Sequence, residues 1–492
     1  MSSPTPSADP RFAPIDRSQC FFRAVDIEAL IPEGHAARIF WTFVGELDLS
    51  RFAAGVKAVE HRAGRSAISP QLLVAMWLYA YSRGMSSARQ IERESEYEPG
   101  LQWLTGMERI NHHTLSDFRV QHGAALQELF VQVLGILSLK KLVTLERVTV
   151  DGTKVRACVN KKTFSRESKI REHLAVARRH VEELQKEESE QEKRGRQAAA
   201  QRRAARQRVE RLEAALEEIA RLRAEKRNEK GKECQASTSD ADAQFMRTGD
   251  DGKAPSYNVQ LAVDGANKLV VGVRVSKQPS DAAHLEPMVE EVKKNAARRP
   301  EQVIADGDYT NRAAVIGMAD GQVDFYGSWQ SQDNRSVPYG IAKEYAASKF
   351  ERDVERDELV CPQGKRLTRR SDRKLEGEAR FHLYTARREA CQQCEARTSC
   401  TPQNRMTKQG RAVLLLQEDS RVTAYHEKMS TDEGKKVYRR RAPIAEFPHA
   451  WIKTKFNFVR MRCRGVVKAT AEALWVCLTY NLQNYFRLTR TA

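Results

Sequence analysis

The chain has 492 residues, more than one hydrophobic core supports, so we expect roughly two to four structural units. Its formal net charge of +18 favours nucleic acid or another anionic surface as partner. No stretch approaches the roughly 20 apolar residues of a membrane-spanning helix, which argues against a membrane protein. Nine cysteines, an odd count, without an apolar secretion signal predict reduced thiols and a cytoplasmic location.

The first part of the chain divides into a tail and a helical unit. Residues 1–19 are polar and Pro-rich, which predicts a disordered tail. Residues 20–145 carry apolar side chains at helical spacing between short breaks, which predicts an all-helical unit. Arg89, Arg93 and Arg119 are expected on exposed faces, where they suit a helix-turn-helix DNA reader. The alternative is a plain helical bundle without a DNA-binding role, in which the arginines are only solvated, and it explains the same pattern equally well.

The first β-rich run then carries an acidic residue. Val148 and Val150 alternate with polar residues before Asp151, and Gly152 allows a sharp turn that leaves the carboxylate at the strand's edge. Many strands end in Asp-Gly for turn reasons alone, so Asp151 is a weak signal by itself. We assign residues 146–163 to an α/β core.

The segment 164–234 is crowded with charged residues, and two apolar stripes at helical spacing run through it. The pattern indicates two helices folded into an antiparallel hairpin near Gly195, or one long interrupted helix. We expect a coiled-coil-like arm for dimerisation or for gripping DNA, with a solvated spacer as the alternative. The stripes are Ile170, Leu174, Val181 and Leu184, and Val209, Leu212, Leu216 and Ile219.

The core resumes at residues 235–327. Two β-rich runs flank Asp264, whose Asp-Gly sequence predicts a hairpin turn rather than a catalytic role. A helix follows, and then a short buried strand that ends at Asp306. Asp308 is a close competitor, because on a continuing strand it faces the same way as Asp306. The order of elements predicts a mixed α/β sheet.

Residues 328–430 form a second insertion, which contains a group of cysteines. Four thiolates at these positions suit a structural zinc ion, because CPQG and CQQC resemble halves of a zinc site. Reduced free thiols are the main alternative, and His382 is a further candidate ligand. The cysteines are Cys361, Cys391, Cys394 and Cys400.

The core ends with residues 431–492, where a helix is expected to carry Glu446. Lys453 is seven residues further on, hence about two turns away on the same face. Arg441 and Tyr438 lie upstream, and cations beside an acid suit DNA phosphates near a metal ion. A plain surface acid is the alternative for Glu446 alone.

In combination these motifs resemble the DDE transposases of bacterial insertion sequences, which have a ribonuclease-H-like catalytic core. The segments that carry the resemblance to the core are VTVDGTKVRA, SYNVQLAVD, VIADGDYTN, the run from Tyr438 to Lys453, RCRG and TYNLQNYF. The segments PQLLVAMWLYAYSRGMSSARQIER, WLTG and NHHTLSDFR resemble the helical N-terminal domain of the same group. The likeness covers most of the chain from about residue 20 onward.

The resemblance implies that Asp151, Asp306 and Glu446 are the catalytic acids. It implies two bound Mg²⁺ ions, for which Mn²⁺ can substitute. The second motif usually has glycine where this chain has Asp308. The spacing between arginine and glutamate varies within the group, so Arg441 competes with its two neighbours as the motif arginine. These neighbours are Arg439 and Arg440.

The resemblance further implies the function of the whole chain. It implies a nucleoid-associated transposase that binds the terminal inverted repeats of an insertion sequence, cleaves DNA and transfers the strand to a target. Double-stranded DNA is then the partner, and the active form is a homodimer or larger. Tyr438, Arg441, Lys453, Arg89, Arg93 and Arg119 are the implied DNA-binding residues. A domesticated transposase that only binds DNA and a nuclease that cuts without joining are the alternatives.

Overall fold

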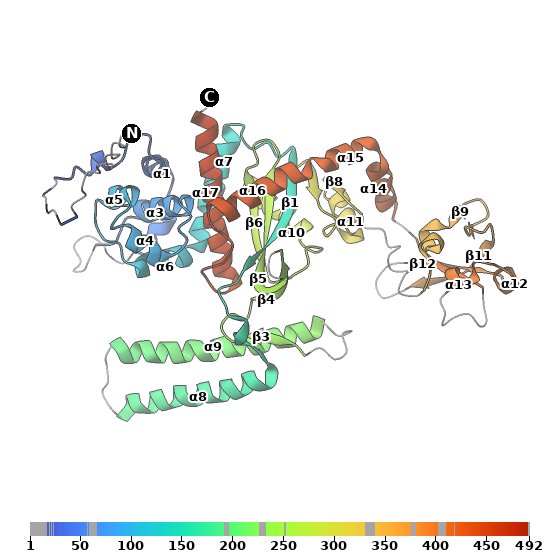
Figure 1. The fold of residues 1–492 in the computed structure, drawn as a ribbon, viewed down its shortest axis with the longest axis horizontal. Coiled ribbons are helices and arrows are strands. Elements are labelled where there is room, and N and C mark those ends of the chain that lie inside the picture. Colours follow the sequence, from blue (N-terminus) through green and yellow to red (C-terminus); the bar gives the residue numbers. More distant parts are fainter. Residues whose placement is uncertain are drawn as a thin grey trace, which may run out of the picture.

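The computed structural model describes residues 24–56, 66–190, 196–225, 233–249, 252–329, 340–374, 380–401, 410–417 and 419–490, together with residues 17, 18, 20, 22 and 58. Of the predicted tail, only residues 17 and 18 belong to this described part. The chain forms a helical N-terminal unit, a central α/β unit, a two-helix arm and a small β-rich module at one end (Figure 1). The predicted mixed α/β class with a helical N-terminal region is confirmed.

The N-terminal unit is helical because apolar residues fill its helix faces. Its helices are η1 (Glu28–Leu30), α1 (Ala36–Gly45), α2 (Ser50–Ala53), α3 (Pro70–Ser82), α4 (Ala88–Glu94), α5 (Pro99–Thr105), α6 (His112–Gln121) and α7 (Gly123–Leu139). Pro70 begins α3, and Asn111 caps α6 by accepting the backbone N–H of His113. Among the described residues no single helix is long and apolar enough to cross a membrane; α6 and α7 together, bent by 72°, pass that test by length and composition.

The central unit is built on a sheet of six strands, namely β1 (Arg147–Arg156), β4 (Gln244–Thr248), β5 (Gly252–Asp264), β6 (Val270–Ser276), β7 (Gln302–Ala305) and β8 (Asp324–Gly327). β1 lies between β5, which runs antiparallel to it, and β7, which runs parallel to it. β8 continues the parallel set beside β7, and both β4 and β6 pair with β5. The parallel strands β7 and β8 are short apolar runs, as is typical of strands covered on both faces.

β5 and β6 form the predicted hairpin, and Asp264 has the predicted turn role. Its buried carboxylate accepts backbone N–H groups from Leu145 at 2.8 Å, Thr144 at 3.1 Å and Ala266 at 2.9 Å. Three such bonds satisfy a buried carboxylate within the fold. Asp264 is therefore a structural residue.

Helices from the second half of the chain cover the sheet, namely α10 (Leu285–Ala296), α11 (Arg312–Asp320), α14 (Ser420–Ser430), α15 (Asp432–Arg439), α16 (Arg441–Lys455) and α17 (Val466–Arg490). α16 lies across β1 and β5, while α17 contacts β6 and also α3 and α7 of the N-terminal unit. Asn481 of α17 bonds both the N–H and the C=O of Val270 in β6. α14 packs against α11 of the central unit, although the sequence placed it in the insertion that ends at residue 430.

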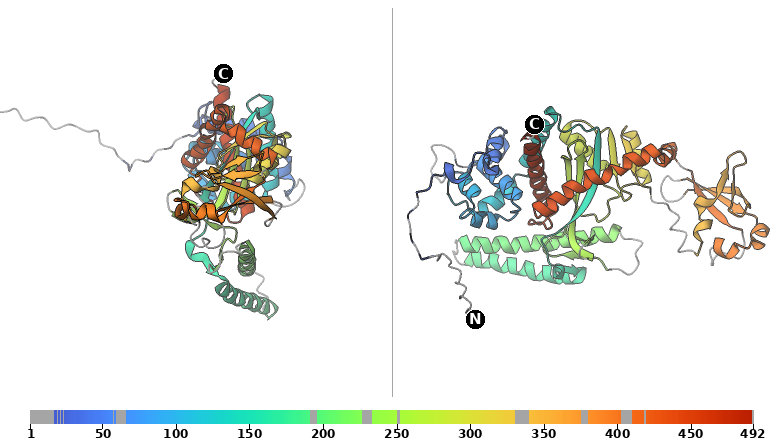
Figure 2. Two further views of the ribbon diagram at one scale, coloured as in Figure 1. Left: turned by 90° about the vertical axis from the view of Figure 1, so that its right-hand side faces the viewer. Right: turned by 45° about the horizontal axis from the view of Figure 1, so that its top comes forward.

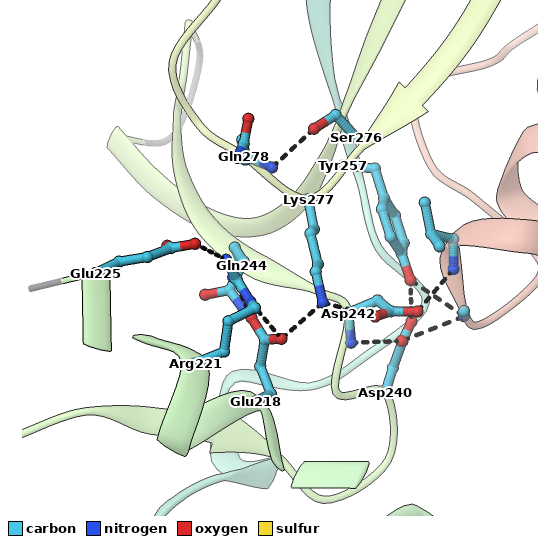
Figure 3. A network of polar contacts seen from close by, with 12 residues as sticks. Glu218, Arg221, Glu225, Asp240, Asp242, Gln244, Tyr257, Ser276, Lys277 and Gln278 are labelled. Atoms are coloured by element: carbon cyan, nitrogen blue, oxygen red, sulfur yellow. Dashed lines mark hydrogen bonds and ion pairs between the residues drawn. The ribbon is translucent and has the colours of Figure 1, made fainter. Parts of the chain in front are cut away.

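The segment between β1 and β4 forms the arm, with β2 (Phe164–Arg166) and β3 (Gln235–Ser237) at its base and α8 (Glu167–Glu190) and α9 (Arg196–Glu225) along its length. Ion pairs from Glu167 to Arg223 and from Arg178 to Glu213 show that the two helices are antiparallel. Of the two arrangements that the sequence left open, the structure has the pair of antiparallel helices, while the turn near Gly195 lies outside the described residues. The arm extends alongside the rest of the molecule (Figure 2) and joins the central sheet through a polar network around Glu218 (Figure 3).

The β-rich module lies beyond β8 and has its own small core (Figure 1). Its strands are β9 (Glu351–Asp353), β10 (Glu358–Val360), β11 (Arg366–Lys374), β12 (Arg380–Ala386) and β13 (Ala412–Leu416), joined by the short helices α12 (Arg388–Gln392) and α13 (Arg397–Cys400). Few apolar residues are buried in it, which is typical of modules that need additional bonds for stability.

Candidate active site

Two carboxylates meet where β1 and β7 lie side by side. The register of these parallel strands pairs Val150 with Ala305, so the next residues, Asp151 and Asp306, are neighbours. Asp306 follows the end of β7, as predicted. Asp151 does not lie at a strand end: β1 continues to Arg156 in its pairing with β5, and Asp151 stands where the pairing with β7 stops. The two acids thus lie side by side where the pairing of β1 with β7 ends, although only Asp306 follows the end of its strand.

Burial dominates the electrostatics of this pair. It raises the pKa of Asp151 to about 6, against the opposing effect of the Arg441 guanidinium. Burial also raises the pKa of Asp306, while the backbone N–H of Asp308 donates to its Oδ1 at 2.9 Å and lowers it. Each carboxylate therefore lies in a place where its charge is poorly solvated, which suits a site that receives a cation.

α16 brings two basic side chains to Asp151. The Arg441 Nη1 lies 3.5 Å from Asp151 Oδ2, and the His449 Nε2 lies 4.0 Å from the same oxygen. Burial lowers the pKa of His449 to about 4, helped by the charges of Lys453 and Arg441 and opposed by the Asp151 backbone, so its imidazole is neutral at neutral pH. Of the three arginines that compete for the motif position, Arg441 is the one in contact with a predicted catalytic acid.

Glu446 lies on the same helix, one turn before His449, with an exposed side chain. No hydrogen bond or ion pair joins it to Asp151 or Asp306 in the described part of the chain. Across these described residues, no three His, Cys, Asp or Glu side chains are arranged to hold a metal ion. The structure therefore brings two of the three predicted acids together and leaves the third exposed on the helix that crosses them.

A further acid, Asp281, lies close to this pair and was not among the predicted site residues. It accepts from Lys154 Nζ at 2.9 Å, Asn258 Nδ2 at 2.6 Å and Gln260 Nε2 at 2.7 Å. A Cβ on Gly152 would come 2.9 Å from its Oδ1, so the cluster reaches the backbone beside Asp151. The sequence offered one sign of this cluster, because Asn258 and Gln260 are polar residues within an otherwise apolar strand. Both side chains are buried in the structure.

The predicted DNA-binding arginines of the N-terminal unit separate into two kinds. Arg89 and Arg93 are exposed, as expected. The prediction of an exposed Arg119 is wrong: it is 5% exposed, donates to the backbone oxygen of Ser86 at 2.7 Å and lies 4.6 Å from the ring centroid of Trp77. Its helix face is covered by α17, so Arg119 is not available to DNA.

Tyr438 and Lys453 flank the site on α15 and α16. Tyr438 is half-buried and packs against the cluster of Ile304, Tyr326 and Val437 below it. Lys453 is also half-buried, and its charge acts on His449. Tyr438 therefore lies beside β7, which leads to Asp306, and Lys453 lies near His449 and hence on the Asp151 side of the site.

The four cysteines of the module line one cavity, together with Tyr345, Leu367 and Arg411. The backbone N–H of Lys365 donates to Cys361 Sγ at 3.2 Å, and that of Arg411 donates to Cys391 Sγ at 3.3 Å. His382 does not line the cavity, and its Nδ1 lies 2.8 Å from Asp372 instead, which removes it as a candidate ligand. Because the described side chains are not arranged for metal binding, zinc stays a prediction.

Two segments of the chain match known protein families. A family model described as a transposase DDE domain matches residues 360–486, which include Glu446 and the cysteines. A second model, described as a transposase domain, matches residues 25–121 of the helical N-terminal unit. No curated protein matches the chain. The two matches, one toward each end of the chain, support a DDE transposase of insertion-sequence type.

Proposed function

We propose that this transposase binds the terminal inverted repeats of its element, cleaves DNA there and transfers the strand to a target. The observation that carries the proposal is the pair Asp151 and Asp306 on adjacent parallel strands, crossed by the helix of Glu446. Double-stranded DNA is the proposed partner, which the charge of +18 supports. The strand arrangement supports a ribonuclease-H-like core, because β5 runs antiparallel to both β1 and β6, while β7 and β8 run parallel to β1.

Members of this family use divalent metal ions, and the residues present fit such ions in part. Asp151 and Asp306 are oxygen donors with poorly solvated charge, as a hard cation requires. Glu446 is the third donor, whose exposed side chain has to turn toward them. Two Mg²⁺ ions held there, or Mn²⁺ in their place, would supply charge stabilisation at the phosphodiester and a more acidic water.

The remaining residues position DNA. Arg441 already lies beside Asp151, and with Lys453 it can pair with phosphate oxygens while the acids face the reacting bond. The exposed Arg89 and Arg93 suit contacts of the N-terminal unit with the element's ends. Transposition joins two ends, so the proposed active form is a homodimer or larger, for which the arm offers an extended surface.

The test is a cleavage and strand-transfer assay on labelled DNA that carries the element's own ends, with Mg²⁺ or Mn²⁺. Asp151→Ala, Asp306→Ala and Glu446→Ala should each lose both steps while still binding the ends. Asp308→Ala, a matched control from the same loop as Asp306, should keep both. Binding without cleavage by the wild type would favour the DNA-binding alternative, and cleavage without joined products would favour a nuclease.

We further infer a structural zinc ion in the β-rich module. The support is that Cys361, Cys391, Cys394 and Cys400 line one cavity and that two of their sulfurs accept backbone N–H groups, as thiolate ligands do. Metal analysis of the purified chain should give one zinc per chain, lost in Cys394→Ser and retained in Cys158→Ser. If the purified wild type contains no zinc and its module is still folded, the four cysteines are reduced free thiols and the zinc proposal is wrong.

A further inference from the structure

His449 has a buried ring nitrogen close to Asp151. Its side chain is 11% exposed, and among the described residues its Nε2 has no hydrogen-bond partner. Buried polar atoms in folded proteins nearly always have a partner, and leaving one unpaired costs roughly 1–3 kcal/mol. What distinguishes this nitrogen is its place beside the buried Asp151 carboxylate, since the two groups together suit a bound cation.

The distance from this nitrogen to Asp151 is compatible with a cation bound between them. It lies 4.0 Å from Asp151 Oδ2, which is too long for a hydrogen bond. Bonds from a metal ion to an imidazole nitrogen and to a carboxylate oxygen are each about 2.1 Å, so one cation reaches two donors up to about 4.2 Å apart. The observed separation lies within this limit.

The helix that carries His449 reinforces the assignment. Ala445, Pro448 and Ile452 of α16 are buried, so this part of the helix is held in place against the sheet. Glu446 and His449 are three residues apart, which places them one above the other on neighbouring parts of the helix surface. A cation between Asp151 and His449 is therefore also next to the residue proposed as the third acid.

Arg441 is the competing partner of the same oxygen. Its guanidinium lies 3.5 Å from Asp151 Oδ2, a long contact between two half-buried groups. A divalent ion in this place would take over the neutralisation of Asp151 and leave the arginine to DNA phosphate. An N–H of Arg441 could donate to the lone pair of an unprotonated His449 Nε2, but among the described residues this nitrogen accepts no hydrogen bond.

We propose that His449 is a nitrogen ligand of the divalent cation that Asp151 holds. The inference rests on the proposed function, because it assumes the metal site at Asp151. A ligand set of carboxylates alone favours Mg²⁺, whereas an added imidazole shifts affinity toward transition metals. This chain should therefore bind Mn²⁺ more tightly, relative to Mg²⁺, than its variant without the imidazole does.

The experiment uses pulsed electron paramagnetic resonance on the full chain with one equivalent of Mn²⁺. The wild type should show the coupling of a directly bound nitrogen-14 to the ion. His449→Gln should lose that coupling and weaken Mn²⁺ binding by about tenfold or more, with a smaller change for Mg²⁺. His284→Gln is the matched control, because His284 Nε2 is also buried without a partner but lies beside Asp281, and this variant should keep the coupling.

Two outcomes would overturn the proposal and are distinguishable. Mn²⁺ bound in a manner that Asp151→Asn abolishes, yet without nitrogen-14 coupling, rejects His449 as a ligand and leaves the metal site at Asp151 intact. Mn²⁺ binding that Asp151→Asn does not affect, or no binding at all, rejects both His449 and the proposed metal site. A folded His449→Leu variant confirms that a loss of coupling reflects the missing nitrogen rather than the glutamine.

Discussion

Glu218 of the arm and Lys277 after β6 form an ion pair of 2.7 Å between the arm and the central unit (Figure 3). The Glu218 side chain is 4% exposed and also accepts from Gln244 Nε2 at 2.9 Å. Lys277 lies 3.5 Å from Asp242 Oδ1, and Asp242 Oδ2 accepts the backbone N–H of Val466 at 3.0 Å, at the first turn of α17. One polar network thus joins the arm, the sheet and the C-terminal helix.

Removing the carboxylate of Glu218 should loosen the arm without unfolding the core. Glu218→Leu leaves Lys277 and Arg221 without their shared buried partner, at a cost of roughly 2–4 kcal/mol at the arm's base. Hydrogen exchange should therefore accelerate in α8 and α9 while β1, β5 and β7 keep their protection. Glu217→Leu, which changes the exposed neighbouring residue, should leave exchange unchanged. Equal exchange in both variants would contradict a holding role for this pair.

Asp151→Asn should stabilise the metal-free protein at neutral pH. The pKa of Asp151 is raised from 3.8 to about 6, so the folded state binds its proton more tightly than the unfolded state does. The protonated carboxyl contributes favourably to the free energy of unfolding, and this contribution is fully present below about pH 4. It is lost as the pH rises through 6, and above that pH the ionised Asp151 costs up to roughly 3 kcal/mol of stability. In chelator at pH 7.5 the variant should melt at a higher temperature than the wild type.

The pH series supplies the check on this prediction. The difference in melting temperature between Asp151→Asn and wild type should shrink toward zero at pH 4, where both side chains are uncharged. Asp308→Asn, which alters an exposed acid in the same loop as Asp306, should change little at either pH. A variant that is less stable than wild type at pH 7.5 would show that the contact with Arg441 outweighs the burial of the charge.

Local sequence patterns predicted the elements whose causes are local. Asp264-Gly265 predicted the hairpin because turn chemistry resides in those residues, and the apolar stripes of 164–234 predicted helical structure while leaving one or two helices open. Asp151 was identified as an acid on a strand, but its position within β1 depends on where the pairing with β7 stops. That limit is set by a strand about 150 residues later in the sequence, which no local pattern contains.

The residues that the sequence missed or misplaced depend on contacts between distant segments. His449 and Asp281 reach Asp151 only because α16 and the segment before α10 pack beside β1. Arg119 lies on a helix face that looks solvated in sequence, yet α17 covers it from more than 340 residues away. Helical periodicity tells which residues share a face, but it does not tell whether a later helix covers that face.

Gly152→Ala should impair both stability and the site. A Cβ there would lie 2.5 Å from Gln260 Nε2, 2.9 Å from Asp281 Oδ1 and 3.0 Å from Tyr309 Oη, all parts of one bonded cluster. Relieving such overlap typically costs about 1–3 kcal/mol and has to shift the cluster behind Asp151. Gly123→Ala, where a Cβ meets nothing within 4 Å, is the matched control and should keep wild-type stability. Denaturant unfolding and Mn²⁺ binding measure the two effects.

Arg119 and Arg93 should respond in opposite ways to substitution. Arg119→Met removes a buried guanidinium that holds Ser86 and stacks on Trp77, beside the buried Glu472, so it should cost roughly 2–4 kcal/mol of stability. Arg93→Met removes an exposed charge and should leave stability unchanged while weakening binding to the element's ends, with a shallower dependence on salt. Thermal unfolding and a salt titration of DNA binding separate the two effects. A stable Arg119→Met variant that binds DNA poorly would reverse the assignment, since it would require α17 to move aside and expose Arg119 when DNA binds.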